Sequence, residues 1–215
     1  ILNGVAFDIL KGSRTVLFGE NGCGKTTLLR LISRLEKPTR GVILQNISGK
    51  FGQKSKQSKK WYKKVGVVYQ NPDYQLFMPT VEKEIKFGAK SDEYADEIAE
   101  KFGVKHLYVR HPQSLSEGQK RRVSIAAVVA TAPEVLILDE PTVGQDYKGL
   151  CEMTEILNRI HEETKNTMIT VTHDKRCAAA LCDRAVWIKD GKVRKTGGKE
   201  LAEEFFKDPT GNAKN

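Results

Sequence analysis

Short apolar runs alternate along this chain with stretches in which apolar residues recur every three or four positions. The runs at residues 16–18, 135–138 and 167–172 have the length and composition of buried strands. Residues 28–35 carry apolar side chains at the spacing of one helix face. Strands that alternate with helices predict an α/β fold with a mostly parallel sheet at its core.

The first part of the chain has a different pattern. Short apolar runs at residues 5–9, 42–45 and 65–69 predict strands and an N-terminal antiparallel β subdomain. From residue 71 to 132 the spacing becomes mainly helical, which predicts a helical insertion. No repeat or long linker is visible, so we expect one domain over residues 1–215. Because the chain begins with isoleucine instead of methionine, we expect it to start inside a longer protein, with the first strand missing.

Capping and turn residues mark the ends of several predicted elements. Thr80 is placed to cap a short helix. Ser91 is placed to cap a clearer helix over residues 92–102, which Gly103 ends. The Asp-Gly pair at 190–191 lies between two apolar runs and is a strong signal for a β-hairpin.

The charge balance is basic, with 36 Lys and Arg against 27 Asp and Glu, a net charge of +9. Seven lysines and no carboxylate lie within residues 50–64. The simpler interpretation is a solvated loop, and the alternative is a patch for nucleic acid or anionic lipid, in which Trp61 and Tyr62 alone are able to stack on bases. No apolar run approaches the roughly 18–20 residues that span a bilayer, so any membrane role requires a partner.

A glycine-rich turn at residues 19–27 joins the strand at 16–18 to a predicted helix, and it has the pattern of a phosphate-binding loop. Glycines let successive backbone N–H groups point at phosphate oxygens, and the helix N-terminus adds positive potential. Lys25 is placed to reach the β- and γ-phosphates, and the Thr26 hydroxyl to bind Mg²⁺. We therefore predict that a nucleoside triphosphate is bound by Asn21, Gly22, Cys23, Gly24, Lys25, Thr26 and Thr27.

The four cysteines form no Cys-x-x-Cys pair and no metal-binding spacing, which indicates free thiols in a reducing cytosol. Cys23 lies inside the phosphate loop, near a helix N-terminus and Lys25. Such a place favours a reactive thiol. The alternative is that a variable loop position happens to be cysteine.

Two carboxylates, Asp139 and Glu140, end the apolar run at 135–138. Asp139 suits Mg²⁺, and Glu140 is placed to orient or deprotonate an attacking water. Such a pair is often only a solvated strand end, but beside a phosphate loop the catalytic interpretation is favoured. His173 follows the strand at 167–172, where contact with a γ-phosphate is possible although a lone histidine there is usually incidental.

Ser116 and Gln119 have the spacing of a capping box at the start of a long helix. A capping box by itself indicates only a structural role, which is to begin the helix. A Ser-x-Gly helix start that includes Gly118 is also an anion site. The segment from residue 115 to 119 reads Leu-Ser-Glu-Gly-Gln.

These motifs, in this order and spacing, resemble the ATP-binding subunit of an ABC transporter over nearly the whole chain. The resemblance implies the ABC ATPase fold, with a RecA-like P-loop core, and ATP hydrolysis with Mg²⁺. It implies that Gln70 links Mg²⁺ and the attacking water to a membrane partner, that Asp146 is the D-loop aspartate and that His173 is the switch histidine. It also implies that Ser116, Gly118 and Gln119 act on ATP held by a second ATPase subunit.

Within that superfamily, residues 69–77, 79–82 and 118–123 look most like the energy-coupling factor (ECF) ATPases. Those importers take up vitamins or transition-metal ions and use two ATPases, a membrane scaffold and a substrate-binding membrane protein. This resemblance implies a peripheral position on the cytoplasmic face of the membrane, with no direct nucleic-acid contact. The apolar segment 74–78 suits docking of a membrane protein's coupling helix, and packing within the helical subdomain is the alternative.

Three positions depart from the family pattern. The aromatic residue that stacks on adenine would lie upstream of Leu2, so that contact has no candidate here. The signature has Glu117 where glycine is commoner, and the D-loop at residues 143–146 reads Val-Gly-Gln-Asp instead of Ser-Ala-Leu-Asp. Neither change removes a phosphate ligand, but either is able to make the two sites of a heterodimer unequal.

Two other functions fit a single ABC ATPase unit. One is a soluble ATPase that acts on nucleic acid or in translation. Its chromosome-organising relatives carry a long coiled coil between the two phosphate-binding motifs, and this chain shows no sustained heptads there. The other is the nucleotide-binding domain of an exporter, and the segment 70–77 argues for the ECF type against it.

Overall fold

The computed structural model describes residues 1–44 and 61–207. Most of the lysine-rich run, residues 50–60, and the last residue of the strand predicted at 42–45 lie outside the described residues. The strands are β1 (Arg14–Phe18), β2 (Val65–Val68), β3 (Val135–Asp139), β4 (Thr167–Val171), β5 (Arg184–Lys189) and β6 (Lys192–Gly197). The α-helices are α1 (Lys25–Ile32), α2 (Val81–Lys86), α3 (Asp92–Lys101), α4 (Glu117–Ala130), α5 (Tyr147–Thr164), α6 (Lys175–Leu181) and α7 (Lys199–Lys207).

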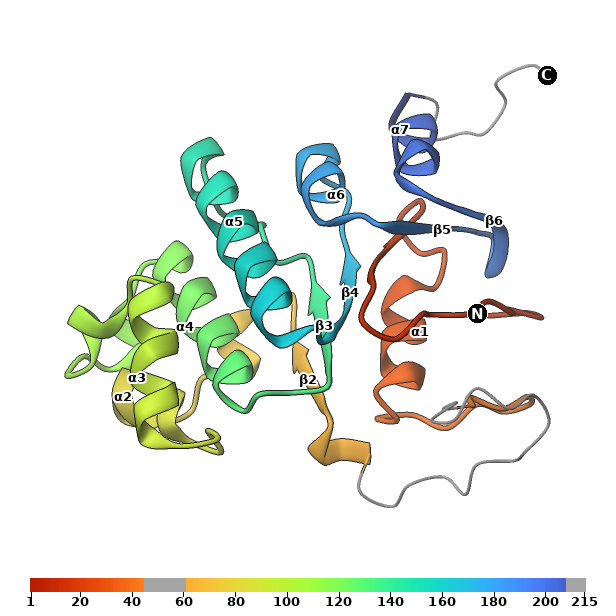
Figure 1. The fold of residues 1–215 in the computed structure, drawn as a ribbon. Coiled ribbons are helices and arrows are strands. Elements are labelled where there is room, and N and C mark those ends of the chain that lie inside the picture. The colour runs from red at the N-terminus through yellow and green to blue at the C-terminus, as the bar shows by residue number, and fades with distance from the viewer. Residues whose placement is uncertain (45–60, 208–215) are drawn as a thin grey trace.

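Over these residues the strands form one sheet in the order β2-β3-β4-β1-β5-β6. All neighbours are parallel except β5 and β6, so the carboxyl ends of β1 to β5 meet at one edge. Figure 1 shows α5, α6 and α7 on one side of the sheet, α1 on the other, and α2, α3 and α4 as a separate group beside β2. The predicted mostly parallel α/β core is confirmed.

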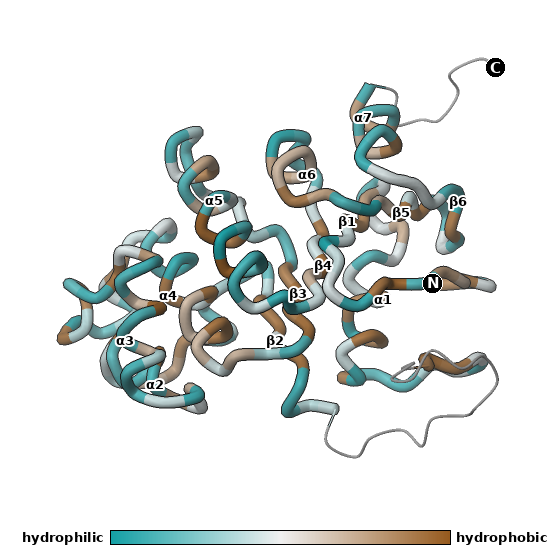
Figure 2. The backbone as a smooth tube through the Cα atoms, in the orientation of Figure 1, coloured by the Kyte–Doolittle hydropathy of each residue, from teal (hydrophilic) through white to brown (hydrophobic). Residues whose placement is uncertain are grey.

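Strand alternation explains why both faces of the sheet are covered. Leu17 and Ile137 pack with α1. Val16 and Phe18, on either side of Leu17 in β1, pack with α6 and α7 on the opposite face. Successive side chains of a strand point to opposite faces, so a strand that is apolar throughout needs helices on both. Figure 2 shows the hydrophobic colour concentrated along the central strands and the hydrophilic colour on the outer turns of the helices.

The predicted N-terminal β subdomain is not formed by the described residues. No strand occurs in residues 1–13 or 41–44. Val5, Phe7 and Ile9 do alternate inward and pack against the core cluster that contains α1, so the predicted burial pattern is correct. A strand also needs a neighbouring backbone, and the first segment reaches the sheet hairpin through Asn3 N–H, which donates to the Gly191 carbonyl at 2.8 Å.

Most predicted element ends are confirmed. Thr80 accepts a hydrogen bond from Lys83 N–H and caps α2, and Ser91 likewise caps α3. Asp190 and Gly191, with φ of 51° and 71°, form the turn between β5 and β6, because both positions of such a hairpin turn need positive φ. The helix predicted over 28–35 ends three residues early, at Ile32, since Arg34 adopts a left-handed conformation with φ of 62°.

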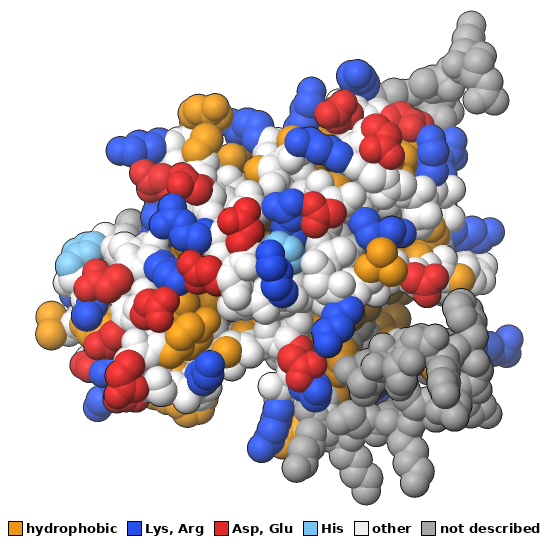
Figure 3. All heavy atoms as spheres, in the orientation of Figure 1, with side chains coloured by type: hydrophobic (Ala, Val, Ile, Leu, Met, Phe, Trp, Pro, Cys, Tyr) orange, Lys and Arg blue, Asp and Glu red, His pale blue; other side chains and the backbone are white. Residues whose placement is uncertain are grey.

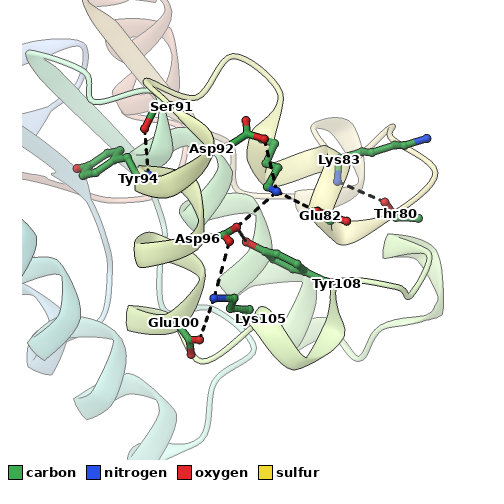
Figure 4. A network of polar contacts seen from close by, with 11 residues as sticks. Thr80, Glu82, Lys83, Ser91, Asp92, Tyr94, Asp96, Glu100, Lys105 and Tyr108 are labelled. Carbon is green, nitrogen blue, oxygen red and sulfur yellow. Dashed lines mark hydrogen bonds and ion pairs between the residues drawn. The ribbon is translucent and has the colours of Figure 1, made fainter.

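Between β2 and β3 the chain is mainly helical, as the spacing over residues 71–132 predicts, and α2, α3 and α4 with the turns between them are called the helical subdomain below. Its outer side carries a network of polar contacts (Figure 4). Lys86 of α2 pairs with Glu82 at 2.9 Å and with Asp96 of α3 at 3.7 Å, and the Tyr108 hydroxyl donates to Asp96 at 2.7 Å. These contacts connect α2, α3 and the turn at Tyr108, so the subdomain is held as one unit.

An aromatic cluster attaches α7 to the sheet. The ring of Phe205 stacks on Phe18 with centroids 4.6 Å apart and meets Trp187 edge to face at 5.2 Å. Phe205 is 6% exposed, whereas the adjacent Phe206 is only partly buried. The C-terminal helix therefore depends on one phenylalanine more than on its neighbour.

We predict that Phe205→Ala lowers the free energy of unfolding by about 3–5 kcal/mol, because it removes a buried ring and leaves a cavity. The matched variant Phe206→Ala should cost clearly less. Urea unfolding followed by circular dichroism measures both. Equal losses for the two variants would contradict the packing described for α7.

Candidate functional site

The phosphate loop connects β1 to α1, and its backbone is turned by glycines. Gly22 and Gly24 have φ of 79° and 105°, in the left-handed region that favours glycine. The Gly24 carbonyl accepts from Leu28 N–H at 2.9 Å and so begins α1. A turn with left-handed glycines that leads directly into a helix N-terminus is the arrangement in which backbone N–H groups bind phosphate.

Gly19 is needed for a different reason, which is close packing. A Cβ on this residue would lie 2.1 Å from the Ile188 carbonyl oxygen of β5 and 2.7 Å from the Cys23 sulfur. No side chain fits in that space. The first glycine of the loop therefore lets the loop lie directly against the end of the neighbouring strand.

The Lys25 side chain folds back across the loop. Its ammonium donates to the carbonyl oxygens of Gly19 at 2.8 Å and Glu20 at 2.9 Å, and lies 3.9 Å from the Cys23 sulfur. Cys23 itself is 7% exposed. Asn21, Gly22 and Thr26 are exposed, and Thr27 is half-buried. The positive charge and the exposed hydroxyl lie at the mouth of the loop, where the sequence predicts a phosphate and Mg²⁺.

The two carboxylates predicted at the end of β3 are both buried, Asp139 with 7% exposed and Glu140 with 6%. Asp139 is level with Val171 of β4 in the parallel register. The pKa of Asp139 is raised to about 6, mainly because the carboxyl is buried and because Glu140 lies beside it. The positive charges of Lys25 and Arg121 act against this rise. Lys25 and Asp139, far apart in sequence, are thus electrostatic neighbours.

Glu140 and His173 are in direct contact, although no spacing in the sequence indicates it. The His173 ring nitrogen Nδ1 lies 2.8 Å from Glu140 Oε1, and His173 N–H donates to Oε2 at 3.3 Å. Glu140 N–H donates to the Val171 carbonyl at 2.8 Å, and its φ is 52°. His173, which follows the end of β4, therefore contacts both oxygens of the Glu140 carboxylate, while its own side chain is 67% exposed.

Gln70 reaches the same edge of the sheet from β2. The strand pairs with β3 up to Val68 opposite Leu138, and Gln70 follows two residues later with an exposed side chain. The ends of β1, β2, β3 and β4 therefore bring together Lys25, Gln70, Asp139, Glu140 and His173.

The predicted anion site at Ser116 is part of the helical subdomain. Both halves of the capping box are present: Ser116 N–H donates to Gln119 Oε1 at 3.1 Å, and Gln119 N–H donates to Ser116 Oγ at 3.4 Å. Among the described residues no hydrogen bond or ion pair joins Ser116, Gly118 or Gln119 to the phosphate loop. The structure thus leaves this motif outside the cluster at the sheet edge.

Asp146 caps α5, where its side chain accepts from Gly149 N–H at 2.7 Å. The preceding Gln145, the unusual residue of this loop, lies against the Ser116 turn, and its side-chain amide is 3.4 Å from the Gly118 carbonyl oxygen. A Cβ on Gly118 would lie 3.1 Å from that amide nitrogen. The D-loop and the Ser116 turn are therefore adjacent within one chain, which sequence spacing alone does not reveal.

Comparison with known proteins agrees with this geometry. Residues 2–143 match the family model described as ABC transporter. The chain is 41% identical over 205 residues to the energy-coupling factor transporter ATP-binding protein EcfA2 of Enterococcus faecalis, a match that covers 88% of this chain and 69% of that protein. It is 36% identical over 216 residues to EcfA of Methanoculleus marisnigri, covering 97% and 76%.

Solved structures give the same result. The chain superposes with a TM-score of 0.79 and 34% identity on cbiO1 from Clostridium perfringens, described as part of the ABC transporter complex cbiONQ, covering 96% of this chain and 84% of that one. It also matches the dimeric ATP-binding cassette MJ0796 bound to ADP and Pi, with a TM-score of 0.78, 27% identity and coverage of 92% and 90%. The resemblance found in the sequence is confirmed: this chain belongs to the ABC transporter family, as one of its ATPase domains.

Proposed function

We propose that this chain, as a single domain, is the ATP-binding and ATP-hydrolysing subunit of an ECF-type importer for a micronutrient, a vitamin or a transition-metal ion. The observation that carries the proposal is the cluster at the sheet edge, where a phosphate loop faces a buried carboxylate pair. The transport role is supported by the similar proteins, since EcfA2 is named as an energy-coupling factor transporter ATP-binding protein and cbiO1 as part of a transporter complex.

ATP fits the donor set of the phosphate loop. Backbone N–H groups of residues 22–27 and the Lys25 ammonium offer hydrogen bonds to phosphate oxygens at the N-terminus of α1. Lys25 now donates to two loop carbonyls, Gly19 and Glu20, and these bonds are the ones that phosphate oxygens would replace. No aromatic residue in the described structure is assigned to the adenine ring.

Mg²⁺ also fits, because oxygen donors surround the mouth of the loop. The Thr26 hydroxyl, the Asp139 carboxylate and the Gln70 side-chain carbonyl are the hard ligands that this ion prefers. When bound, the ion would neutralise charge that develops on the phosphates. Burial and Glu140 raise the pKa of Asp139 to about 6, and a bound cation would lower it again by favouring the ionised carboxylate.

Glu140 is the proposed general base. Its carboxylate is buried and fixed by two contacts with His173, so it does not have to reorganise when a water molecule is oriented for attack. The exposed imidazole of His173 is able to hold this carboxylate in place and to touch the γ-phosphate. Gln70, at the end of β2, is placed to align the same water.

Ser116, Gly118, Gln119 and Asp146 are proposed to complete the ATP site of a second ATPase subunit. The side-chain amide of Gln145, next to Asp146, contacts the Gly118 carbonyl, so these residues lie side by side. None of them is bonded to the chain's own phosphate loop within the described residues. The ADP-bound relative is a dimer, which supports this arrangement. Two such chains, identical or paralogous, would each supply half of both sites.

The membrane contact is proposed to run through a partner at the cytoplasmic face. None of the helices in the described part of the chain is both long and apolar enough to cross a bilayer. Tyr74, Phe77 and Phe87 are exposed by 82%, 67% and 57%, and the rings of Phe77 and Phe87 meet edge to face, which suits an apolar partner helix. On the face drawn in Figure 3, basic and acidic side chains are interspersed.

We predict that Glu140→Gln lowers ATP turnover by about 10²-fold or more, the scale of losing one preorganised group, and traps an ATP-bound dimer. Glu134→Gln is the control, because Glu134 precedes the opposite end of β3 and pairs with Lys64 at 2.6 Å. Phosphate release and size-exclusion chromatography with ATP measure the two effects. Turnover at the wild-type rate in Glu140→Gln would refute its role as base.

We predict that Lys25→Ala removes measurable ATP binding, since a charged hydrogen-bond donor contributes roughly 10- to 100-fold in affinity and this one also organises the loop. Lys175→Ala is the control, because Lys175 begins α6 after a strand of the same sheet. Titration calorimetry with ATP checks both variants. Unchanged affinity in Lys25→Ala would rule out the phosphate loop as the ATP site.

A further inference from the structure

Three consecutive basic residues near the start of α4 donate hydrogen bonds to three different partners, which are a side chain at Asp73, the backbone at residues 69–70 and a side chain of α5. Lys120 and Arg121 are 8% and 3% exposed, and Arg122 follows them. Lysine and arginine are almost never buried this far unless they are paired. Their partners therefore show what this part of α4 is built to hold.

Arg121 holds the backbone that contains Gln70. Its Nη1 donates to the Tyr69 carbonyl at 2.8 Å, and its Nη2 donates to the Gln70 carbonyl. A rigid guanidinium fork is well suited to two successive carbonyls. Among the described residues Arg121 forms no ion pair, and its Nε has no partner. What the buried side chain supplies is a fixed connection between α4 and residues 69–70.

Two further contacts extend the connection along the chain. The Lys120 ammonium lies 2.8 Å from Asp73 Oδ1, and the Gln75 side-chain amide donates to the Ser124 carbonyl at 2.9 Å. Lys120 and Ser124, the partners of Asp73 and Gln75, both belong to α4. The turn at residues 72–75 is thus attached to the same helix as Gln70.

The far end of the segment is attached to α2. Glu84 is a carboxylate only 3% exposed, and its Oε2 accepts from Phe77 N–H at 2.9 Å and Met78 N–H at 2.7 Å. From Tyr69 to Met78 the chain is therefore held by side chains of the helical subdomain. The backbone pairing with the sheet ends one residue earlier, at Val68.

The Ser116 turn directly precedes the residues that make these contacts. Lys120 N–H donates to the Ser116 carbonyl at 2.8 Å, so the capping turn and the two basic residues share one turn of helix. We propose that Arg121 and Lys120 are positioning residues that couple the segment 69–78 to the turn 116–119, so that Gln70 and Ser116 shift together. This inference rests on the proposed function, in which Gln70 serves the chain's own ATP and Ser116 the ATP of a second subunit.

The consequence is a direct connection between two ATP sites. A displacement of residues 69–78, whether caused by ATP beside Gln70 or by a protein bound to the exposed rings, reaches the Ser116 turn through the side chains of Arg121 and Lys120 and the first turn of α4. The junction between Val68 and Tyr69 is where movement relative to the sheet is expected.

Arg122 provides a matched control. It is the next basic residue on α4, but its guanidinium pairs with Glu152 of α5 at 2.6 Å. Arg122→Gln therefore removes an arginine contact from the same helix without releasing residues 69–78. Arg121→Lys keeps the charge while it loses the fork, and it should recover part of the coupling.

Hydrogen–deuterium exchange of the purified chain, with and without Mg-ATP and at a concentration where light scattering reports a monomer, tests the coupling. In the wild type and in Arg122→Gln, ATP should slow exchange at residues 69–71 and 116–119 together. In Arg121→Gln the response at 116–119 should be lost while residues 19–27 remain protected by ATP. If Arg121→Gln does not fold, Lys120→Gln and Asp73→Asn, which remove the more exposed contact, should weaken the response at 116–119.

Steady-state turnover gives the second readout. Arg121→Gln should lower kcat by roughly 10²-fold, the scale of a small misplacement, and leave the KM for ATP unchanged. A response at 116–119 in Arg121→Gln equal to the wild type, or an equal loss of kcat in Arg122→Gln, would overturn the coupling alone. If ATP protects residues 19–27 in no variant, the proposed function fails, and the coupling falls with it.

Discussion

The parallel register of β1, β3 and β4 is the constraint on which the site depends. It brings the end of β1, with the phosphate loop, to the same sheet edge as the ends of β3 and β4. Asp139 lies level with Val171, and from there the chain needs only two more residues to place His173 against Glu140. A one-residue shift in register would move every side chain of a strand to the opposite face and disrupt its packing against the helices there, so packing protects the alignment of these groups.

In the proposed function the same sheet provides half of an ATP site. Lys25, Asp139, Glu140 and His173 are attached to the sheet, whereas the Ser116 turn belongs to the helical subdomain. Charged and polar side chains connect that subdomain internally and hold residues 69–78 to it. In the proposed function the sheet holds ATP, and the helical subdomain carries the surface offered to partners. The boundary between the sheet and the helical subdomain lies at the end of β2, after Val68.

Local signals in the sequence predicted most of this organisation. The phosphate loop, the helix caps at Thr80, Ser91 and Ser116, and the hairpin at 190–191 are encoded by neighbouring residues, and the structure contains all of them. The strands predicted at 5–9 and 42–45 were wrong for the described residues, because alternation specifies a buried face but not a partner strand. Contacts between distant residues, such as Glu140 with His173, Gln145 with Gly118, and Arg121 with Tyr69, depend on the fold and leave no local pattern.

The central claim is that the Ser116 turn acts on ATP held by another subunit. Measuring ATP affinity and ATP turnover for Ser116→Arg, a change that places a large charged side chain at the start of α4, tests it most directly. The account predicts that the chain binds ATP as tightly as the wild type while turnover is lost. Loss of ATP affinity in the monomeric chain, or turnover at the wild-type rate, would contradict the claim.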